Sequence, residues 1–88
     1  MREYTEALRL AKREAEERFP EGEYTLKVLL WCDDDFRISV RHGFGQTGDE
    51  EVGNSLAEEI VVTPHRAELQ VIETTRSERT NIHKREDL

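Results

Sequence analysis

The chain contains little lysine, one cysteine and no long apolar segment. Three of its 13 basic residues are lysine and ten are arginine, against 20 acidic residues, which gives a formal net charge of −7. The single cysteine excludes an internal disulfide and fits a reducing compartment. The lack of about 18 consecutive apolar residues excludes a membrane-spanning helix. The N-terminal segment is charged and carries no apolar signal sequence, so we expect a cytoplasmic protein that does not enter membranes.

This composition also limits the partners. Many carboxylates with few lysines suggest a halophilic-like, salt-adapted protein, in which dissolved ions screen the repulsion between carboxylates. The negative charge argues against broad binding to nucleic acid, because such binding depends on neutralising phosphates. A chain of 88 residues forms one domain with a small core. A partner subunit would add buried surface to it.

Residues 2–19 are predicted to form a helix. Their apolar residues recur at three- or four-residue intervals, as on the buried face of a helix. Pro20 ends the helix, because the residue before a proline avoids helical geometry. The apolar stripe consists of Tyr4, Leu8, Ala11, Ala15 and Phe19, with Ala7 beside it. We expect this stripe to pack on the apolar face of the hairpin that follows.

Residues 24–44 are predicted to form that β-hairpin. The stretch from Tyr24 to Cys32 is rich in β-branched, aromatic and aliphatic residues, and the stretch from Phe36 to His42 alternates apolar with polar residues. Three aspartates lie between them and favour a turn, because their side chains bond to nearby backbone groups.

The loop length decides which side chains share a face of this hairpin. A two-residue loop places Leu30 opposite Arg37 and mixes apolar with charged residues on one face. A three-residue loop, residues 33–35, makes one face almost wholly apolar and requires an aspartate at positive φ. We therefore expect the second arrangement. Its pairs are Cys32 with Phe36, Leu30 with Ile38, Val28 with Val40 and Leu26 with His42.

The opposite face of the hairpin is the candidate binding site. It gathers three positive charges and a tryptophan on an acidic chain, from residues Lys27, Leu29, Trp31, Arg37 and Arg41. Three interpretations remain open. The face is a plain surface with a cation–π contact between Trp31 and Arg37, or an interface with another protein. Alternatively, it is a platform for single-stranded nucleic acid or another anionic ligand.

Residues 43–48 match the spacing G-x-G-x-x-G without its structural context. A dinucleotide site needs a helix N-terminus and parallel strands, whereas acidic residues 49–51 follow directly here. We expect a flexible glycine loop. Residues 49–59 fit either a short helix, with Ser55 and Glu58 resembling a capping box, or a loop that leads into a strand.

A second hairpin is predicted from residues 59–63 and 67–74. Its four-residue loop contains Pro64, where the missing N–H does no harm. This loop gives a second apolar face. Its pairs are Val62 with Ala67 and Ile60 with Leu69.

No group of residues indicates catalysis. A metal site needs three or four converging ligands, and the three histidines and Cys32 show no such spacing. In the expected register Cys32 faces the core beside Asp33, which favours a buried, unreactive thiol. The aspartates 33–35 form a tight turn rather than a calcium-binding loop. We therefore expect no enzyme, no cofactor and no metal.

The sequence thus predicts an α+β fold: an N-terminal amphipathic helix on an antiparallel sheet of about four strands in two hairpins. Residues 1–75 form the domain, and the highly charged residues 76–88 form a flexible tail. The predicted function is a small protein-interaction module that binds itself or another protein, as a homodimer through the Trp31 face or a sheet edge. The alternative is an anionic ligand or single-stranded nucleic acid on the Lys27/Trp31/Arg37/Arg41 face.

Overall fold

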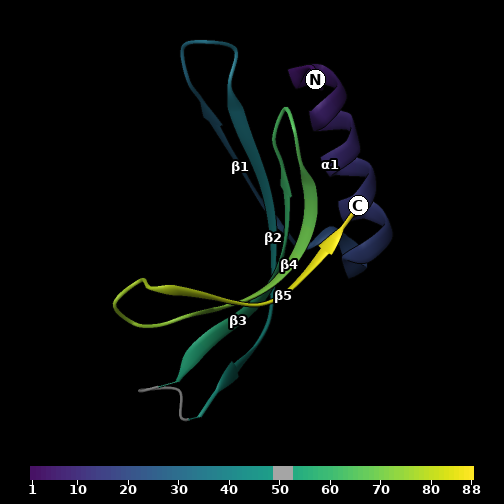
Figure 1. The fold of residues 1–88 in the computed structure, drawn as a ribbon. Coiled ribbons are helices and arrows are strands. Elements are labelled where there is room, and N and C mark those ends of the chain that lie inside the picture. The colour runs from purple at the N-terminus through teal and green to yellow at the C-terminus, as the bar shows by residue number, and fades with distance from the viewer. Residues whose placement is uncertain (49–52) are drawn as a thin grey trace.

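The computed structural model describes residues 1–48 and 53–88. Its elements are α1 (Tyr4–Arg18), a 3-10 helix η1 (Pro20–Gly22), β1 (Thr25–Leu30), β2 (Phe36–Thr47), β3 (Asn54–Val62), β4 (Ala67–Thr74) and β5 (Thr80–Asp87). Within these residues, five strands form one antiparallel sheet in which strands adjacent in sequence are adjacent in space (Figure 1). The α+β fold is therefore confirmed, with five strands where about four were expected.

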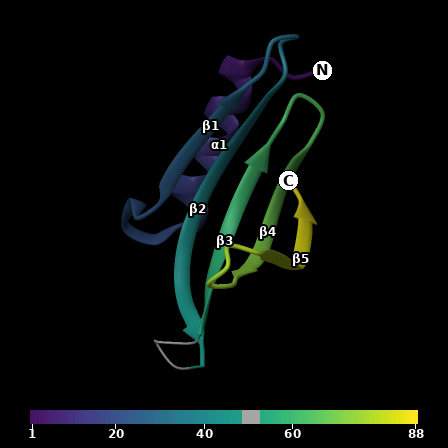
Figure 2. The same cartoon turned by 90° about the vertical axis from the view of Figure 1, so that its left-hand side faces the viewer.

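Helix α1 lies on one side of the sheet (Figure 2), where it contacts β2 and β3. A row of alanines faces the sheet: Ala7, Ala11 and Ala15 are fully buried. Such small side chains let a helix approach a sheet closely. Phe19 follows the helix in extended geometry and is also buried, as expected for the residue before a proline.

The helix was expected to cover the first hairpin, β1 and β2. Instead it covers the two strands with the largest apolar rows on this side. The buried residues of that core are Phe36, Ile38 and Val40 from β2, Ile60 and Val62 from β3, and Ala67 from β4. Strand β1 makes no close backbone contact with α1, and Val28 reaches the core only in part. The apolar row of β1 is thus left largely uncovered.

The first hairpin has the expected faces but a different register. The observed pairs are Leu30 with Phe36, Val28 with Ile38 and Leu26 with Val40. The Trp31 N–H donates to the Asp35 carbonyl at 3.0 Å, so the three loop residues are 32–34 instead of 33–35. Asp34 takes the positive φ, at 58°, which fits a three-residue loop whose last residue is left-handed. Cys32 is consequently an exposed loop residue, not a core thiol.

The second hairpin forms as predicted. Val62 pairs with Ala67 and Ile60 with Leu69. The loop is closed by the Thr63 N–H donating to the Arg66 carbonyl at 2.8 Å. The Thr63 hydroxyl also accepts the Arg66 N–H at 3.0 Å. This local bonding explains why the sequence suffices to place the turn.

Two other segments differ from expectation. The glycine-rich residues 43–47 continue β2 and pair with β3, with a bulge between Gly43 and Gly45, so they are not a flexible loop. Residues 80–87 form β5 on the free edge of β4, in place of the expected tail. In the ambiguous stretch, residues 54–59 belong to β3, while residues 49–52 lie outside the described part of the chain.

Candidate functional site

Strand β1 is the edge strand with the most exposed apolar surface. Leu26 is 45% exposed, Leu29 37% and Leu30 69%. Leu26 and Leu30 point to the side that carries α1, and Leu29 points to the opposite side, because alternate residues of a strand face opposite ways. Each face of the edge therefore carries at least one exposed leucine.

Within residues 1–48 and 53–88, no strand pairs with the outer side of this edge. Only alternate residues of an edge strand bond to the neighbouring strand, and the others direct their N–H and C=O outward. The Trp31 N–H bonds to β2 through Asp35, so the alternation directs the polar groups of Leu26, Val28 and Leu30 away from β2. An edge of this kind is a template for pairing with another strand.

The other edge, β5, is protected. A bulge interrupts its pairing with β4 between Val71 and Ile72, and the second half of the strand, residues 84–87, is entirely charged. Bulges and charges on an edge are two ways in which proteins prevent unwanted strand pairing. Strand β1 pairs with β2 without a register shift and contains one charged residue, Lys27.

A hollow of about 500 Å³ adjoins the end of β1. It lies between the start of α1 and the first hairpin loop, and Tyr4 packs edge-on against Phe36 at its base, with ring centroids 5.6 Å apart. Trp31 borders this hollow and is 53% exposed. The apolar surface of β1 therefore extends to the N-terminal end of the helix.

The predicted binding face lies on the side of the sheet opposite α1. Lys27, Leu29, Arg37 and Arg41 share this side, because Leu29 pairs with Arg37 and Lys27 with Ser39. Trp31 lies just past the end of β1, at the closing pair of the hairpin loop, and lines the hollow beside α1. The structure thus groups the charged residues and places the tryptophan at the end of the strand.

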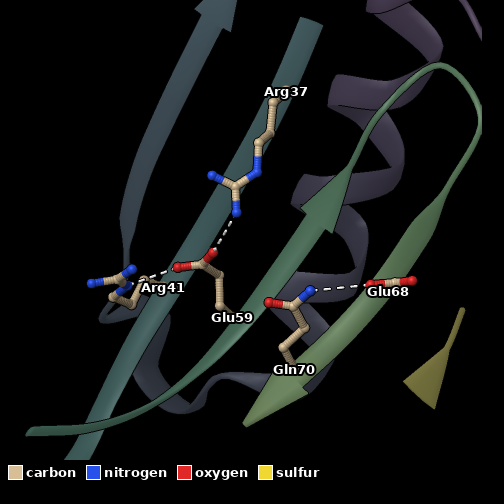
Figure 3. Close-up of polar contacts among 5 residues, drawn as sticks. All are labelled: Arg37, Arg41, Glu59, Glu68 and Gln70. Atoms are coloured by element: carbon tan, nitrogen blue, oxygen red, sulfur yellow. Dashed lines mark hydrogen bonds and ion pairs between the residues drawn. The ribbon is translucent and has the colours of Figure 1, made fainter. Parts of the chain in front are cut away.

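Glu59 of β3 binds both arginines of this face (Figure 3). Its carboxylate accepts hydrogen bonds from Arg37 Nη2 at 3.3 Å and from Arg41 Nε at 2.8 Å. Glu59 is 3% exposed, although no helix of the described residues covers this side. Glu59 was not among the residues predicted for the site. The available signal was its position directly before the apolar residues 60–62 of the predicted strand, where a buried glutamate requires a cationic partner.

The neighbouring strand continues this polar surface. Gln70 pairs with Glu59 in the ladder, is buried, and donates from Nε2 to Glu68 at 3.1 Å (Figure 3). Glu59 and Gln70 thus lie side by side on neighbouring strands, and both are buried. No buried side-chain polar atom lacks a partner in the described residues, so this side of the sheet is satisfied internally.

A second polar cluster joins four strands at the far end of the sheet. The Glu73 carboxylate of β4 accepts hydrogen bonds from Asn54 of β3 and Thr47 of β2, and contacts His83 of β5 at 2.6 Å. The bond from Asn54, followed by that from His83, lowers the pKa of Glu73 below its ordinary value of 4.5. Hydrogen bonds to an ionised carboxylate stabilise that form.

His42 of β2 lies outside both polar clusters. His42 stacks on Phe19 at 5.3 Å, and its Nδ1 lies 2.8 Å from the Glu23 carbonyl. Across residues 1–48 and 53–88, no three His, Cys, Asp or Glu side chains are placed to hold a metal ion.

Comparison with known proteins gave no match to a family model, to a curated protein or to a solved structure. Among the described elements, α1 is neither long enough nor apolar enough to cross a membrane.

Proposed function

We propose that this protein is a small, non-catalytic interaction module that forms a homodimer by pairing the β1 strands of two copies. The single observation that supports this most is the unprotected β1 edge. It presents apolar side chains on both faces and outward backbone groups on a strand without a bulge or proline. Strand addition uses such an edge: the backbone supplies hydrogen bonds and alternate side chains supply contact area.

The contrast between the two edges supports the choice of β1. Strand β5 is bulged and charged, whereas β1 exposes three leucines. Fully burying a leucine side chain is worth about 1.5–3 kcal/mol. Partly covering several leucines at once therefore supplies substantial free energy to a dimer.

The charge distribution also favours a second copy of the chain at this edge. Two molecules of net charge −7 repel each other, but β1 has no acidic residue. Pairing here brings no carboxylate of one strand against a carboxylate of the other. Salt-adapted surroundings would screen the remaining long-range repulsion.

The alternative function, binding of an anionic ligand or single-stranded nucleic acid, has weaker support. Glu59 already accepts hydrogen bonds from both Arg37 and Arg41 and neutralises one of their charges. Trp31 lies at the end of the strand, beside the hollow. We therefore do not place the main function on the Lys27/Arg37/Arg41 side.

The test is the molar mass of the protein in solution, by light scattering after size exclusion. Val28→Pro removes an outward N–H and puts a ring on the edge, while leaving the bonds between β1 and β2 to the alternate residues. Val28→Thr is the matched control, because it keeps the N–H and the branched shape. We expect twice the monomer mass for the wild type and Val28→Thr, and the monomer mass for Val28→Pro.

A second variant distinguishes loss of the dimer from misfolding of the chain. Leu30 is the most exposed of the three leucines of β1, so Leu30→Lys changes the edge charge with little effect on the core. We expect it to form a folded monomer, checked by circular dichroism. A monomeric wild type over a wide range of protein and salt concentrations would disprove the proposal, as would a dimer that survives both edge variants.

A further inference from the structure

We infer that Val28 lies on the two-fold axis of this dimer, opposite the Val28 of the partner subunit. The inference rests on the proposed function, since it specifies how the two β1 strands align. It makes a claim that a dimer alone does not make, because several alignments of the two edges are geometrically allowed. The choice among them follows from the backbone and side chains of β1.

Symmetry first restricts where the axis passes. Two identical edge strands that pair in antiparallel fashion are related by a two-fold axis perpendicular to the sheet. Residues directly opposite each other in such a pair point to the same side of the sheet. If the axis passed between two consecutive residues, the residues opposite each other would have side chains on different sides of the sheet. The axis therefore passes through one residue of β1.

The outward backbone groups then select a residue. The Trp31–Asp35 hydrogen bond sets which alternate residues of β1 bond to β2. The N–H and C=O groups of the others, Leu26, Val28 and Leu30, therefore point away from β2. With Val28 on the axis, Leu26 of each copy lies opposite the partner's Leu30. All three outward residues then find partners, and none is left beside a loop.

An axis through any other residue of β1 gives less favourable contacts between the two strands. An axis at Lys27 opposes two lysines directly, and like charges in opposed positions destabilise a sheet. An axis at Leu29 places Leu26 opposite Cys32, which lies in the hairpin loop. An axis at either end of β1 shortens the paired segment and leaves outward groups in water.

The axis at Val28 also suits both faces of the new sheet. On the side of α1, Leu26, Val28 and Leu30 of the two copies form one continuous apolar row. On the other side, each Lys27 lies opposite the partner's Leu29. The lysine can then lay its aliphatic stem along the leucine and keep its ammonium group in water.

The test uses single cysteines on β1 in a Cys32→Ser background. Opposed residues that exchange hydrogen bonds have Cα atoms about 5.5 Å apart, within the range of about 4.4–6.8 Å that a disulfide spans. Val28→Cys should therefore form a disulfide-linked dimer under mild oxidation. The matched controls are Leu26→Cys and Leu30→Cys, whose like positions lie about 14 Å apart across the axis.

Crosslinking is followed on non-reducing gels, with molar mass measured under reducing conditions. We expect Val28→Cys to crosslink at least about tenfold faster than either control, since only its thiols reach disulfide distance. An equimolar mixture of Leu26→Cys and Leu30→Cys should crosslink well, because these positions oppose each other. The crosslinked product should be the mixed dimer.

The outcomes separate this inference from the proposed function. Fastest crosslinking at Lys27→Cys or Leu29→Cys, with dimer mass, would overturn the axis at Val28 and keep the dimer through β1. Dimer mass with slow crosslinking at every β1 position would overturn the inference and the β1 interface together. A monomer under reducing conditions would overturn the proposed function itself.

Discussion

Arg41 Nε donates a hydrogen bond to Glu59 at 2.8 Å, from a half-exposed arginine to a buried glutamate on the neighbouring strand. The two residues pair directly in the ladder between β2 and β3. Arg37, four residues earlier on β2, binds the other oxygen of the same carboxylate. The result is a buried negative charge that depends on two side chains at the surface.

Replacing Arg41 should destabilise the fold. Arg41→Ala leaves Glu59 buried with one longer bond to Arg37, and losing a hydrogen bond to a buried charge costs about 1–3 kcal/mol. Arg13→Ala is the control, because Arg13 is exposed on α1. Urea unfolding followed by fluorescence of the single tryptophan measures both free energies. Equal values for the two variants would show that Glu59 does not rely on Arg41.

A double variant tests whether the buried ion pair of Glu59 stabilises the fold at all. A buried ion pair is often no more stable than apolar residues of the same volume. We therefore expect the double variant Arg41→Ala with Glu59→Leu to recover much of the stability that Arg41→Ala loses. If the double variant is less stable than Arg41→Ala alone, the ion pair is a net source of stability.

The Glu73 cluster predicts a loss of stability in acid. The folded-state pKa of Glu73 is lower than its ordinary value, so Glu73 contributes stability above pH 4.5 that is lost as the pH falls through the folded-state value. Unfolding midpoints of the wild type and Glu73→Gln should therefore converge below that range. Asn54→Ala removes the main cause of the shift. It should raise the pKa of Glu73, as measured by NMR titration of its side-chain carbon, and an unchanged pKa would contradict this account.

The alanine row of α1 predicts sensitivity to added volume. Ala11 is fully buried between the helix and the sheet, so Ala11→Leu should push α1 outward at a cost of about 1–3 kcal/mol. Lys12→Leu adds the same side chain on the exposed side of α1 and should change stability little. Thermal melts compare the two. If Ala11→Leu is as stable as the wild type, the helix does not pack as closely as the alanines imply.

The alternation of apolar residues was enough to predict both hairpins and their faces. It could not fix the register of the first hairpin. Moving the loop from 33–35 to 32–34 shifts every pair yet keeps each side chain on the same face, so the hydrophobic pattern is identical for both. Backbone geometry sets the register, since the observed loop places Asp34 at φ 58°. In the second hairpin, Thr63 and Pro64 confined the turn to one place.

Strand β5 and Glu59 were not predictable from composition. Every residue of β5 is exposed, so its charges stay in water while its backbone bonds to β4. A high content of charged residues predicts that the side chains lie in water. It does not predict whether the backbone pairs with another strand. Glu59 is buried because Arg37 and Arg41 reach it from the next strand, a contact that requires the register between β2 and β3.

Cys32 gives a direct test of the loop. It is exposed at the hairpin tip, whereas the register expected from the sequence buried it. A thiol reagent such as Ellman's should therefore modify Cys32 in the folded protein as fast as in urea, within a small factor. Strong protection in the native state, relieved by urea, would favour the register with Cys32 opposite Phe36.

The salt dependence of dimerisation distinguishes the proposed dimer from a complex held together by opposite charges. Two chains of net charge −7 repel each other at a distance, and molar salt screens that repulsion while leaving apolar contacts intact. The dissociation constant of the β1 dimer should therefore fall as potassium chloride rises, and sedimentation equilibrium measures it. Lys27→Gln makes each chain more negative, so it should weaken the dimer at low salt and lose that effect at high salt. If salt instead dissociates the wild-type dimer, its contact is an attraction between opposite charges. The Lys27/Arg37/Arg41 side would then replace the β1 edge as the interface.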